Sequence, residues 1–209
     1  MKSLSKTIFQ LYDRVFPYLK NIRGTTRLHR KLLKNWLDGK EIKFEENYYS
    51  TDYRGTEILA KSFSDLEDVY RENLIDSYLY QHNLEPDNRV LVAGAYPGAF
   101  VTYLSKNLPK GEVIAVEPDE DNRKRLEKTL DLNNVENVKI VENPIYSTET
   151  TINFSEKGNH ASRISKEAKE EKNTTTIDKL AESYGEFDLI TMDIEGAEAK
   201  VLPEYLSTN

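Results

Sequence analysis

Three short stretches of the chain hold residues whose types and spacing suit chemistry. Gly94 and Gly98 bracket a five-residue turn, Glu117 follows a short apolar run, and three carboxylates crowd residues 193–198. Glycines let a ligand approach the backbone closely, while carboxylates accept hydrogen bonds or protons. Together these stretches predict a site that binds a polar organic ligand and has an acid beside it.

The first two stretches are each open to a second interpretation. The glycine spacing is G-x-x-x-G rather than the dinucleotide pattern G-x-G-x-x-G, so by itself it is equally typical of a tight turn. Glu117 lies roughly 20 residues after the turn, where an acid can accept hydrogen bonds from both hydroxyls of a ribose. The alternative is that Glu117 helps to cap the next helix beside Asp119.

The carboxylates of the third stretch are Asp193, Glu195 and Glu198. An acid there can orient an acceptor hydroxyl or take its proton. The structural alternative is an acidic helix N-terminus, which the helix dipole favours. His160 is the other candidate base, because histidine titrates near neutral pH, although a lone loop histidine is more often a surface residue.

Alternating strands and helices must position these residues. Short apolar runs predict main strands, and helical spacing or caps predict helices between them, with one more short strand at 151–154. The expected main strands are 90–93, 113–116, 138–141 and 187–193, and the expected helices are 100–108, 119–132, 176–184 and 197–206. This order predicts a doubly wound α/β sheet, whose ligands bind at the carboxyl ends of the strands.

The N-terminal part differs from this pattern. Residues 1–85 are expected to be a mostly helical extension, with helical periodicity at 4–19 and 64–78 and a polar aromatic loop at 41–55. Residues 86–209 are expected to form the α/β domain.

Charge is distributed unevenly along the chain. Residues 1–40 carry a net charge of +8, which leaves −15 for the rest, since the whole chain carries −7. An acidic body excludes nucleic-acid binding by bulk charge. The basic arm is expected to pack on the acidic body; the alternative is contact with an anionic membrane surface or an acidic protein partner.

Composition excludes several other classes. There is no cysteine, the three histidines are not spaced as a ligand pair, and no apolar run approaches the roughly 20 residues of a membrane span. The N-terminus lacks a secretion signal. We therefore expect a cytoplasmic protein without a transition-metal site.

Residues 85–206 resemble the FkbM-type family of S-adenosylmethionine-dependent methyltransferases. The resemblance rests on five motifs in the family's order, namely Gly94-Ala95-Tyr96-Pro97-Gly98, Ile114-Ala115-Val116-Glu117-Pro118-Asp119, Asn159-His160-Ala161-Ser162-Arg163-Ile164, Thr174-Thr175-Thr176-Ile177-Asp178-Lys179-Leu180 and Met192-Asp193-Ile194-Glu195-Gly196-Ala197-Glu198. The last is the most specific. The resemblance implies a Rossmann-like class I methyltransferase sheet, S-adenosylmethionine as cofactor, and a hydroxyl of a sugar, glycan or other small molecule as acceptor.

The resemblance also implies roles for individual residues. Catalytic roles fall to Asp193 and Glu195, with His160 as the alternative base. Cofactor contacts fall to Gly94, Ala95, Tyr96 and Gly98 at the methionine and ribose, Glu117 at the ribose, Asn143 near the adenine, and Asp193 beside the reacting centre.

The chain departs from the family in two ways. The family usually has an acid two residues before the first glycine of the turn, where this chain has Val92, so we expect weakened cofactor binding. A class I sheet has seven strands, whereas four main ones are expected here, so we expect either a C-terminally truncated domain or a partner chain that covers the edge of the fourth strand. The rival functions are a non-catalytic methyltransferase-like binding or assembly protein and, third, a nicotinamide dehydrogenase.

Overall fold

The computed structural model describes residues 42–45, 48–53, 55–60, 79, 83–157, 162–165, 167–194 and 196–208. The chain divides into two units, Met1–Asn73 and Leu74–Asn209, so the division falls before the boundary expected at residue 85. The helices expected at 4–19 and 64–78 lie outside the described residues, as do His160 and Glu195. None of the described helices is both long and apolar enough to cross a bilayer.

The first unit contains a three-stranded antiparallel sheet where a polar aromatic loop within a helical extension was expected. Its strands are β1 (Ile42–Glu45), β2 (Tyr48–Tyr53) and β3 (Thr56–Ala60), in the order β1-β2-β3. Tyrosine, threonine and isoleucine favour strands, and Gly55 at φ 80° supplies the turn between β2 and β3. The loop interpretation was therefore wrong for Ile42–Glu45 and Tyr48–Tyr53, because β-propensity and the glycine turn outweigh the polarity of the segment.

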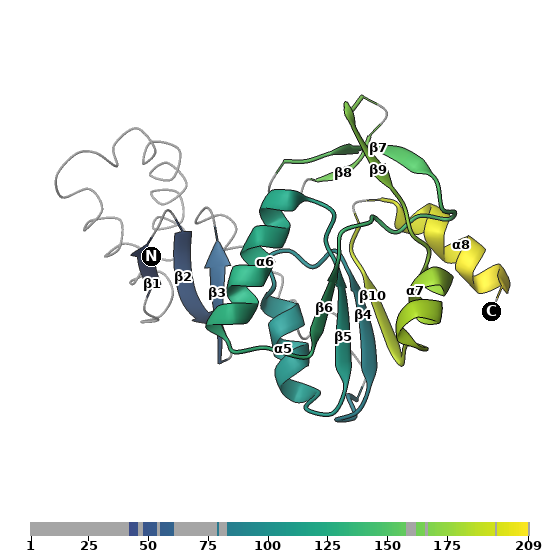
Figure 1. The fold of residues 1–209 in the computed structure, drawn as a ribbon. Coiled ribbons are helices and arrows are strands. Elements are labelled where there is room, and N and C mark those ends of the chain that lie inside the picture. The colour runs from purple at the N-terminus through teal and green to yellow at the C-terminus, as the bar shows by residue number, and fades with distance from the viewer. Residues whose placement is uncertain are drawn as a thin grey trace, which may run out of the picture. The chain divides into compact units, whose positions relative to one another are not determined.

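The second unit is built on a parallel sheet of four strands. These are β4 (Arg89–Ala93), β5 (Glu112–Val116), β6 (Val138–Val141) and β10 (Leu189–Met192), in the order β10-β4-β5-β6. Helices α5 (Ala99–Asn107) and α6 (Glu120–Leu132) lie on one side, and α7 (Ile177–Tyr184) and α8 (Glu198–Thr208) on the other (Figure 1). The prediction of a doubly wound α/β sheet is confirmed.

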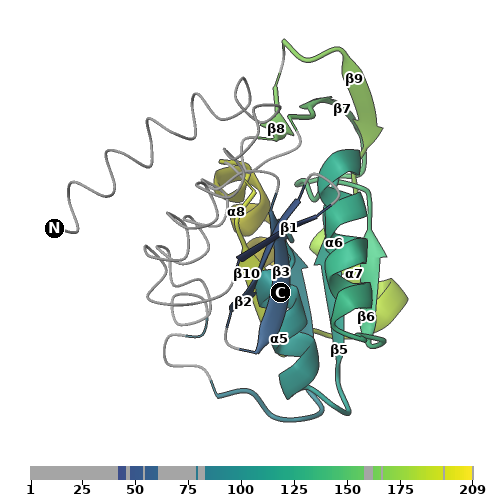
Figure 2. The ribbon, with the colours of Figure 1, turned by 90° about the vertical axis from the view of Figure 1, so that its left-hand side faces the viewer.

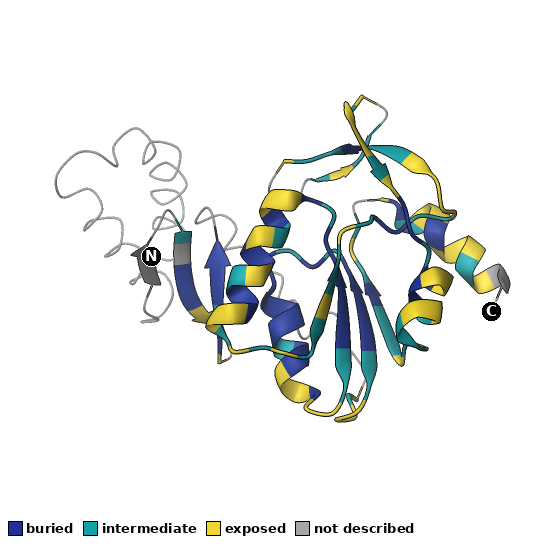
Figure 3. Ribbon diagram, viewed as in Figure 1, coloured by how far each residue is buried: buried dark blue, intermediate teal, exposed yellow. Residues whose placement is uncertain are grey.

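Both faces of the inner strands are covered. Leu91, Ala93, Ile114 and Val116 pack in one cluster with residues of α7 and α8, while the alternate residues of β4 and β5 face the other way and are also buried. Figure 3 accordingly shows most of both inner strands in the buried colour and the outer faces of the helices exposed. This double burial explains why the strands are continuous apolar runs in the sequence.

Local capping signals fix where the helices begin and end. The Asp119 side chain accepts a hydrogen bond from the amide of Asn122 at the start of α6, and Thr176 does the same with Lys179 at the start of α7. Asn133 and Asn134, the latter at φ 53°, end α6. The order of the sheet reverses at β4, which has β5 on one side and β10 on the other. Such a switch point is where doubly wound sheets bind ligands.

A second antiparallel sheet lies beyond the carboxyl ends of the parallel strands (Figure 1, Figure 2). It consists of β7 (Thr151–Ser155), β8 (Arg163–Ile164) and β9 (Glu170–Asn173), in the order β8-β7-β9. Only β7 was expected from the sequence. Within the described residues β10 forms an edge of the main sheet; its coverage by a partner chain stays a prediction.

Candidate functional site

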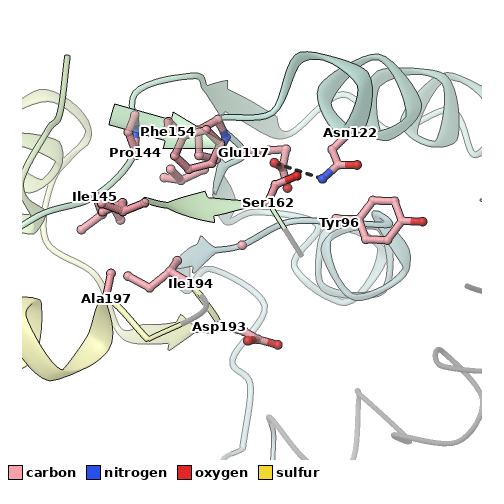
Figure 4. Close-up of a pocket in the computed structure, with 14 residues that line it drawn as sticks. Tyr96, Glu117, Asn122, Pro144, Ile145, Phe154, Ser162, Asp193, Ile194 and Ala197 are labelled. Carbon is pink, nitrogen blue, oxygen red and sulfur yellow. Dashed lines mark hydrogen bonds between the residues drawn. The ribbon is translucent and has the colours of Figure 1, made fainter. Parts of the chain in front are cut away.

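A pocket opens at the carboxyl ends of the parallel strands and divides into two parts (Figure 4). One part is apolar, lined by Pro144, Ile145, Phe154, Ile194 and Ala197. The other part is polar, lined by Tyr96, Glu117, Asn122, Ser162 and Asp193. A ligand that fits both parts has an apolar end and an end rich in hydrogen-bonding groups.

The glycine turn forms the floor of the pocket for a different reason than expected. A Cβ on Gly94, whose φ is +88°, would lie 2.0 Å from the carbonyl oxygen of Asp193, so the glycine lets the ends of β4 and β10 approach each other. A Cβ on Gly98 would lie 3.0 Å from Cδ1 of Leu126, because the start of α5 packs on α6. Gly94 lines the pocket, whereas Gly98 serves the packing of the helices.

The neighbouring turn residues Ala95 and Tyr96 differ in whether they line the pocket. Tyr96 lines the pocket, and the guanidinium carbon of Arg125 lies 5.0 Å from the centroid of its ring. Ala95 is buried in the core and is not among the residues that line the pocket. Half of the expected turn contacts are therefore placed at the pocket.

Glu117 is a buried acid in the polar part of the pocket. Its side chain is 4% exposed, and Oε1 accepts a hydrogen bond of 3.0 Å from the amide of Asp119 and one of 3.5 Å from Nδ2 of Asn122. Burial raises the pKa of Glu117 from 4.5 to about 7, and the charge of Asp119 adds to this, against the hydrogen bonds that stabilise the ionised form. Glu117 thus contacts the start of α6 and also lines the pocket, and its binding of a ribose stays a prediction.

Asn122 and Arg125 were not anticipated from the sequence. Arg125 is 2% exposed, and its Nη2 donates a hydrogen bond of 2.6 Å to Oδ1 of Asn122. This contact fixes the Asn122 amide with its nitrogen toward Glu117. The signal in the sequence is only the i, i+3 spacing of an amide and a cation on one helix, which is common.

Asp193 and Glu198, the two described carboxylates of the acidic stretch after β10, have different surroundings. Asp193 is exposed and lines the pocket, with its carboxylate directed away from Glu117 (Figure 4). Glu198 instead accepts a hydrogen bond of 2.7 Å from the amide of Ile194, at the start of α8. Glu198 therefore lies in the first turn of α8, as the dipole interpretation expects, whereas Asp193 lines the pocket and its catalytic role stays a prediction.

Asn143 lies beside the antiparallel sheet. Its Nδ2 donates a hydrogen bond of 2.9 Å to the carbonyl of Asn173 at the end of β9. The next two residues, Pro144 and Ile145, line the pocket in its place. Asn143 is therefore not among the residues that line this pocket, and its contact with the adenine stays a prediction.

Val92 lies inside the main sheet, whereas the antiparallel sheet contributes residues to the pocket. Val92 is buried in the main sheet, where it pairs with Thr191 and Ala115. Phe154 and Ile164 of the antiparallel sheet line the pocket, together with Ser162. Ser162 and Ile164 belong to the third motif of the family resemblance, whereas no local signal marks Phe154, because only the fold carries β7 to the carboxyl ends of the main strands.

Solved structures with some likeness to the chain include several methyltransferases. TYW2 of M. jannaschii, in complex with AdoMet, matches with 19% identity and a TM-score of 0.35, over 49% of this chain and 46% of that one. A SAM-dependent methyltransferase from Agrobacterium tumefaciens matches with 12% identity and a TM-score of 0.36, over 49% and 34%. Coclaurine N-methyltransferase, bound to N-methylheliamine and SAH, matches with 20% identity and a TM-score of 0.32, over 35% and 21%.

In each of these three structures the match spans less than two thirds of the other chain. No curated protein matches the sequence. The model of the methyltransferase FkbM domain matches residues 93–208, which is more than half of the chain and contains every residue of the pocket. The chain therefore belongs to the FkbM methyltransferase family.

Proposed function

We propose that this chain binds S-adenosylmethionine in the pocket at the carboxyl ends of β4, β5 and β10 and methylates a hydroxyl of a sugar, glycan or other small molecule. The observation that supports this most directly is Glu117, a buried acid with a raised pKa that lines the pocket at the end of β5. Ionisable groups held out of their ordinary range in a pocket are typical of functional sites.

The two parts of the pocket fit the two ends of an adenosine. Ile145 and Phe154 offer apolar surface for the base, where Asn143 had been expected. Glu117 and Asn122 offer an acceptor and an amide for the ribose hydroxyls. A hydrogen bond to a charged group is worth about 1.5–3 kcal/mol, so Glu117 can supply much of the affinity for the ribose.

Asp193 is our candidate for the acceptor side of the reaction. The bound cofactor supplies an activated methyl group on a sulfonium, and the protein supplies orientation and electrostatics. The exposed carboxylate of Asp193 lies in the same pocket but is turned away from Glu117, so it can orient an acceptor hydroxyl or take its proton. Glu195 and His160 stay as further candidates on sequence grounds.

Calorimetric titration with S-adenosylhomocysteine tests the cofactor assignment. Because Val92 stands where the family usually has an acid, we expect the wild-type chain to bind toward the weaker end of the roughly 1 μM to 1 mM range that is ordinary for enzyme ligands. Glu117→Gln should weaken it at least about tenfold, because the ionised acceptor is lost. Glu112→Gln is the matched control, since Glu112 lies at the amino end of the same strand, 3.6 Å from Nε of Arg89.

Two results would contradict the proposal. One is a wild-type chain that takes up no S-adenosylhomocysteine at millimolar concentration. The other is equal affinity in the Glu117→Gln and Glu112→Gln variants, which would leave the buried acid without a role in binding.

The second candidate function is a non-catalytic methyltransferase-like protein used for binding or assembly. Val92 favours it, because a buried valine stands where the family usually has an acid near the amino-acid portion of the cofactor. Transfer of a labelled methyl group from S-adenosylmethionine to a panel of sugars and other hydroxylated acceptors separates the two. Methyl transfer to one acceptor class supports the enzyme, whereas cofactor binding with no transfer supports the second candidate.

A further inference from the structure

One buried carboxylate joins the antiparallel sheet to the first turn of α6. Asp119 is 0% exposed, and both of its oxygens accept hydrogen bonds. Oδ1 accepts one of 3.0 Å from the amide of Asn122, which caps α6. Oδ2 accepts one of 2.9 Å from the amide of Lys157 and one of 2.6 Å from the hydroxyl of Ser162.

The two groups bound by Oδ2 lie at the two ends of the connection between β7 and β8. Lys157 follows β7, Ser162 precedes β8, and the amide of Lys157 also lies 2.9 Å from Oγ of Ser162. A single oxygen atom of Asp119 therefore holds both ends of this connection against α6.

The same hairpin carries one wall of the pocket. Phe154 of β7 pairs with Ile164 of β8, and both line the pocket together with Ser162. Figure 4 shows Phe154 and Ser162 beside Glu117. Holding the hairpin against α6 thus holds these side chains next to the buried acid.

We propose that Asp119 is a positioning residue of the site, which ties the β7–β8 hairpin to α6 through Ser162 and so holds Phe154, Ser162 and Ile164 against a bound cofactor. The proposal rests on the proposed function for the identity of the ligand. We call the contact among Asp119, Lys157 and Ser162 the Asp119 tie.

The backbone of Asp119 strengthens this assignment. Its amide donates a hydrogen bond of 3.0 Å to Oε1 of Glu117, so one residue holds the acid with its main chain and the opposite wall with its side chain. A helix cap needs only one carboxylate oxygen, and here that oxygen is Oδ1. The cap alone therefore leaves the contacts of Oδ2 unexplained.

The first test measures the affinity of the full chain for S-adenosylhomocysteine by calorimetry. Ser162→Ala should bind about tenfold more weakly, the factor expected for one hydrogen bond to a charged group. Ser162→Thr, which keeps a hydroxyl, should restore binding to within about twofold of wild type, which a general loss of packing would not do. Ser165→Ala is the matched control, because the contact of the Ser165 hydroxyl among the described residues is a long one of 3.4 Å, accepted from the amide of Glu167.

Equal affinity in wild type and Ser162→Ala would overturn the proposal, and so would a Ser162→Thr variant as weak as Ser162→Ala. A wild-type chain that does not bind the ligand would instead defeat the proposed function, and a second measurement then decides the role of the tie.

That measurement is amide hydrogen exchange in the ligand-free chain. In Asp119→Asn, Lys157 and Ser162 face one of two groups in place of the carboxylate. One is the side-chain NH₂ group, which cannot accept a hydrogen bond, and the other is a neutral carbonyl, which accepts more weakly. We expect the amide of Lys157 to exchange at least about tenfold faster in this variant, with the amides of β5 unchanged. Unchanged exchange at Lys157 would show that Asp119 does not hold the hairpin, whatever the chain binds.

Discussion

Glu117 is expected to make the protein less stable as the pH rises toward neutrality, and Glu117→Gln should remove this effect. The carboxyl is buried, and its pKa is raised from 4.5 to about 7 in the folded chain. A glutamine has a similar shape, keeps an oxygen that accepts from the amide of Asp119, and carries no charge. The variant should therefore be more stable than wild type above pH 7.

The sign and size follow from proton linkage. Well below pH 4.5 both the folded and the unfolded chain hold the proton, so the ionisation of Glu117 does not change the free energy of unfolding there. Between 4.5 and about 7 the unfolded chain ionises first, and the free energy of unfolding falls as the pH rises. Above about 7 the full difference is reached, which amounts to about 3 kcal/mol, an order-of-magnitude figure.

Urea denaturation at a series of pH values from about 5 to 8 measures this directly. The difference in unfolding free energy between Glu117→Gln and wild type should grow with pH and level off above about 7. Glu112→Gln, at the other end of β5, should give a curve parallel to that of wild type. A constant difference across the range, or a Glu117→Gln variant that is less stable at pH 8, would refute the reasoning.

Two further predictions concern the floor and the mouth of the pocket. Gly94→Ala should lower the free energy of unfolding by at least about 3 kcal/mol, since the new Cβ would lie 2.0 Å from a backbone oxygen. Gly196→Ala is the control: Gly196 has φ +93° and nothing within 4 Å of the added Cβ, so this variant should lose only about 1–2 kcal/mol. Equal losses in urea denaturation would contradict the close approach of β4 and β10. Asp193→Asn should reduce kcat for methyl transfer about 100-fold or more, but leave the affinity for S-adenosylhomocysteine within about twofold of wild type, because the Asp193 carboxylate is turned away from Glu117. Steady-state kinetics measure kcat, and calorimetry measures the affinity. A loss confined to affinity would assign Asp193 to cofactor binding instead.

Local signals in the sequence were sufficient for the parallel sheet. The runs at 90–93 and 113–116 are apolar throughout because both faces of β4 and β5 are buried, and such runs are recognisable without knowledge of their neighbours. Asp119 and Thr176 mark the starts of α6 and α7 because capping uses residues only three positions apart. Glu117 was recognised for a related reason. It directly follows an apolar run, and the carboxyl ends of the strands are where doubly wound sheets bind ligands.

The antiparallel strands could not be recognised in the same way. Glu170–Asn173 reads Glu-Glu-Lys-Asn and carries no apolar periodicity, so β9 exists through its pairing with β7. The hydrogen bond of Asn143 could not be anticipated for the same reason, because its partner Asn173 is 30 residues away in the chain. Contacts over such distances leave no local pattern.

By itself, then, the sequence determined the order of the parallel strands and their helices, the caps, the membership of the FkbM methyltransferase family and the acid at the end of β5. Only the tertiary structure decided what surrounds that acid. It placed the hairpin of β7 and β8 over the pocket, gave Oδ2 of Asp119 its second set of partners, and removed Glu117 from water so that its pKa rises to about 7. The physical reason is that burial and hydrogen bonding across the fold depend on which segments meet, whereas strand and helix formation depend mainly on neighbours along the chain.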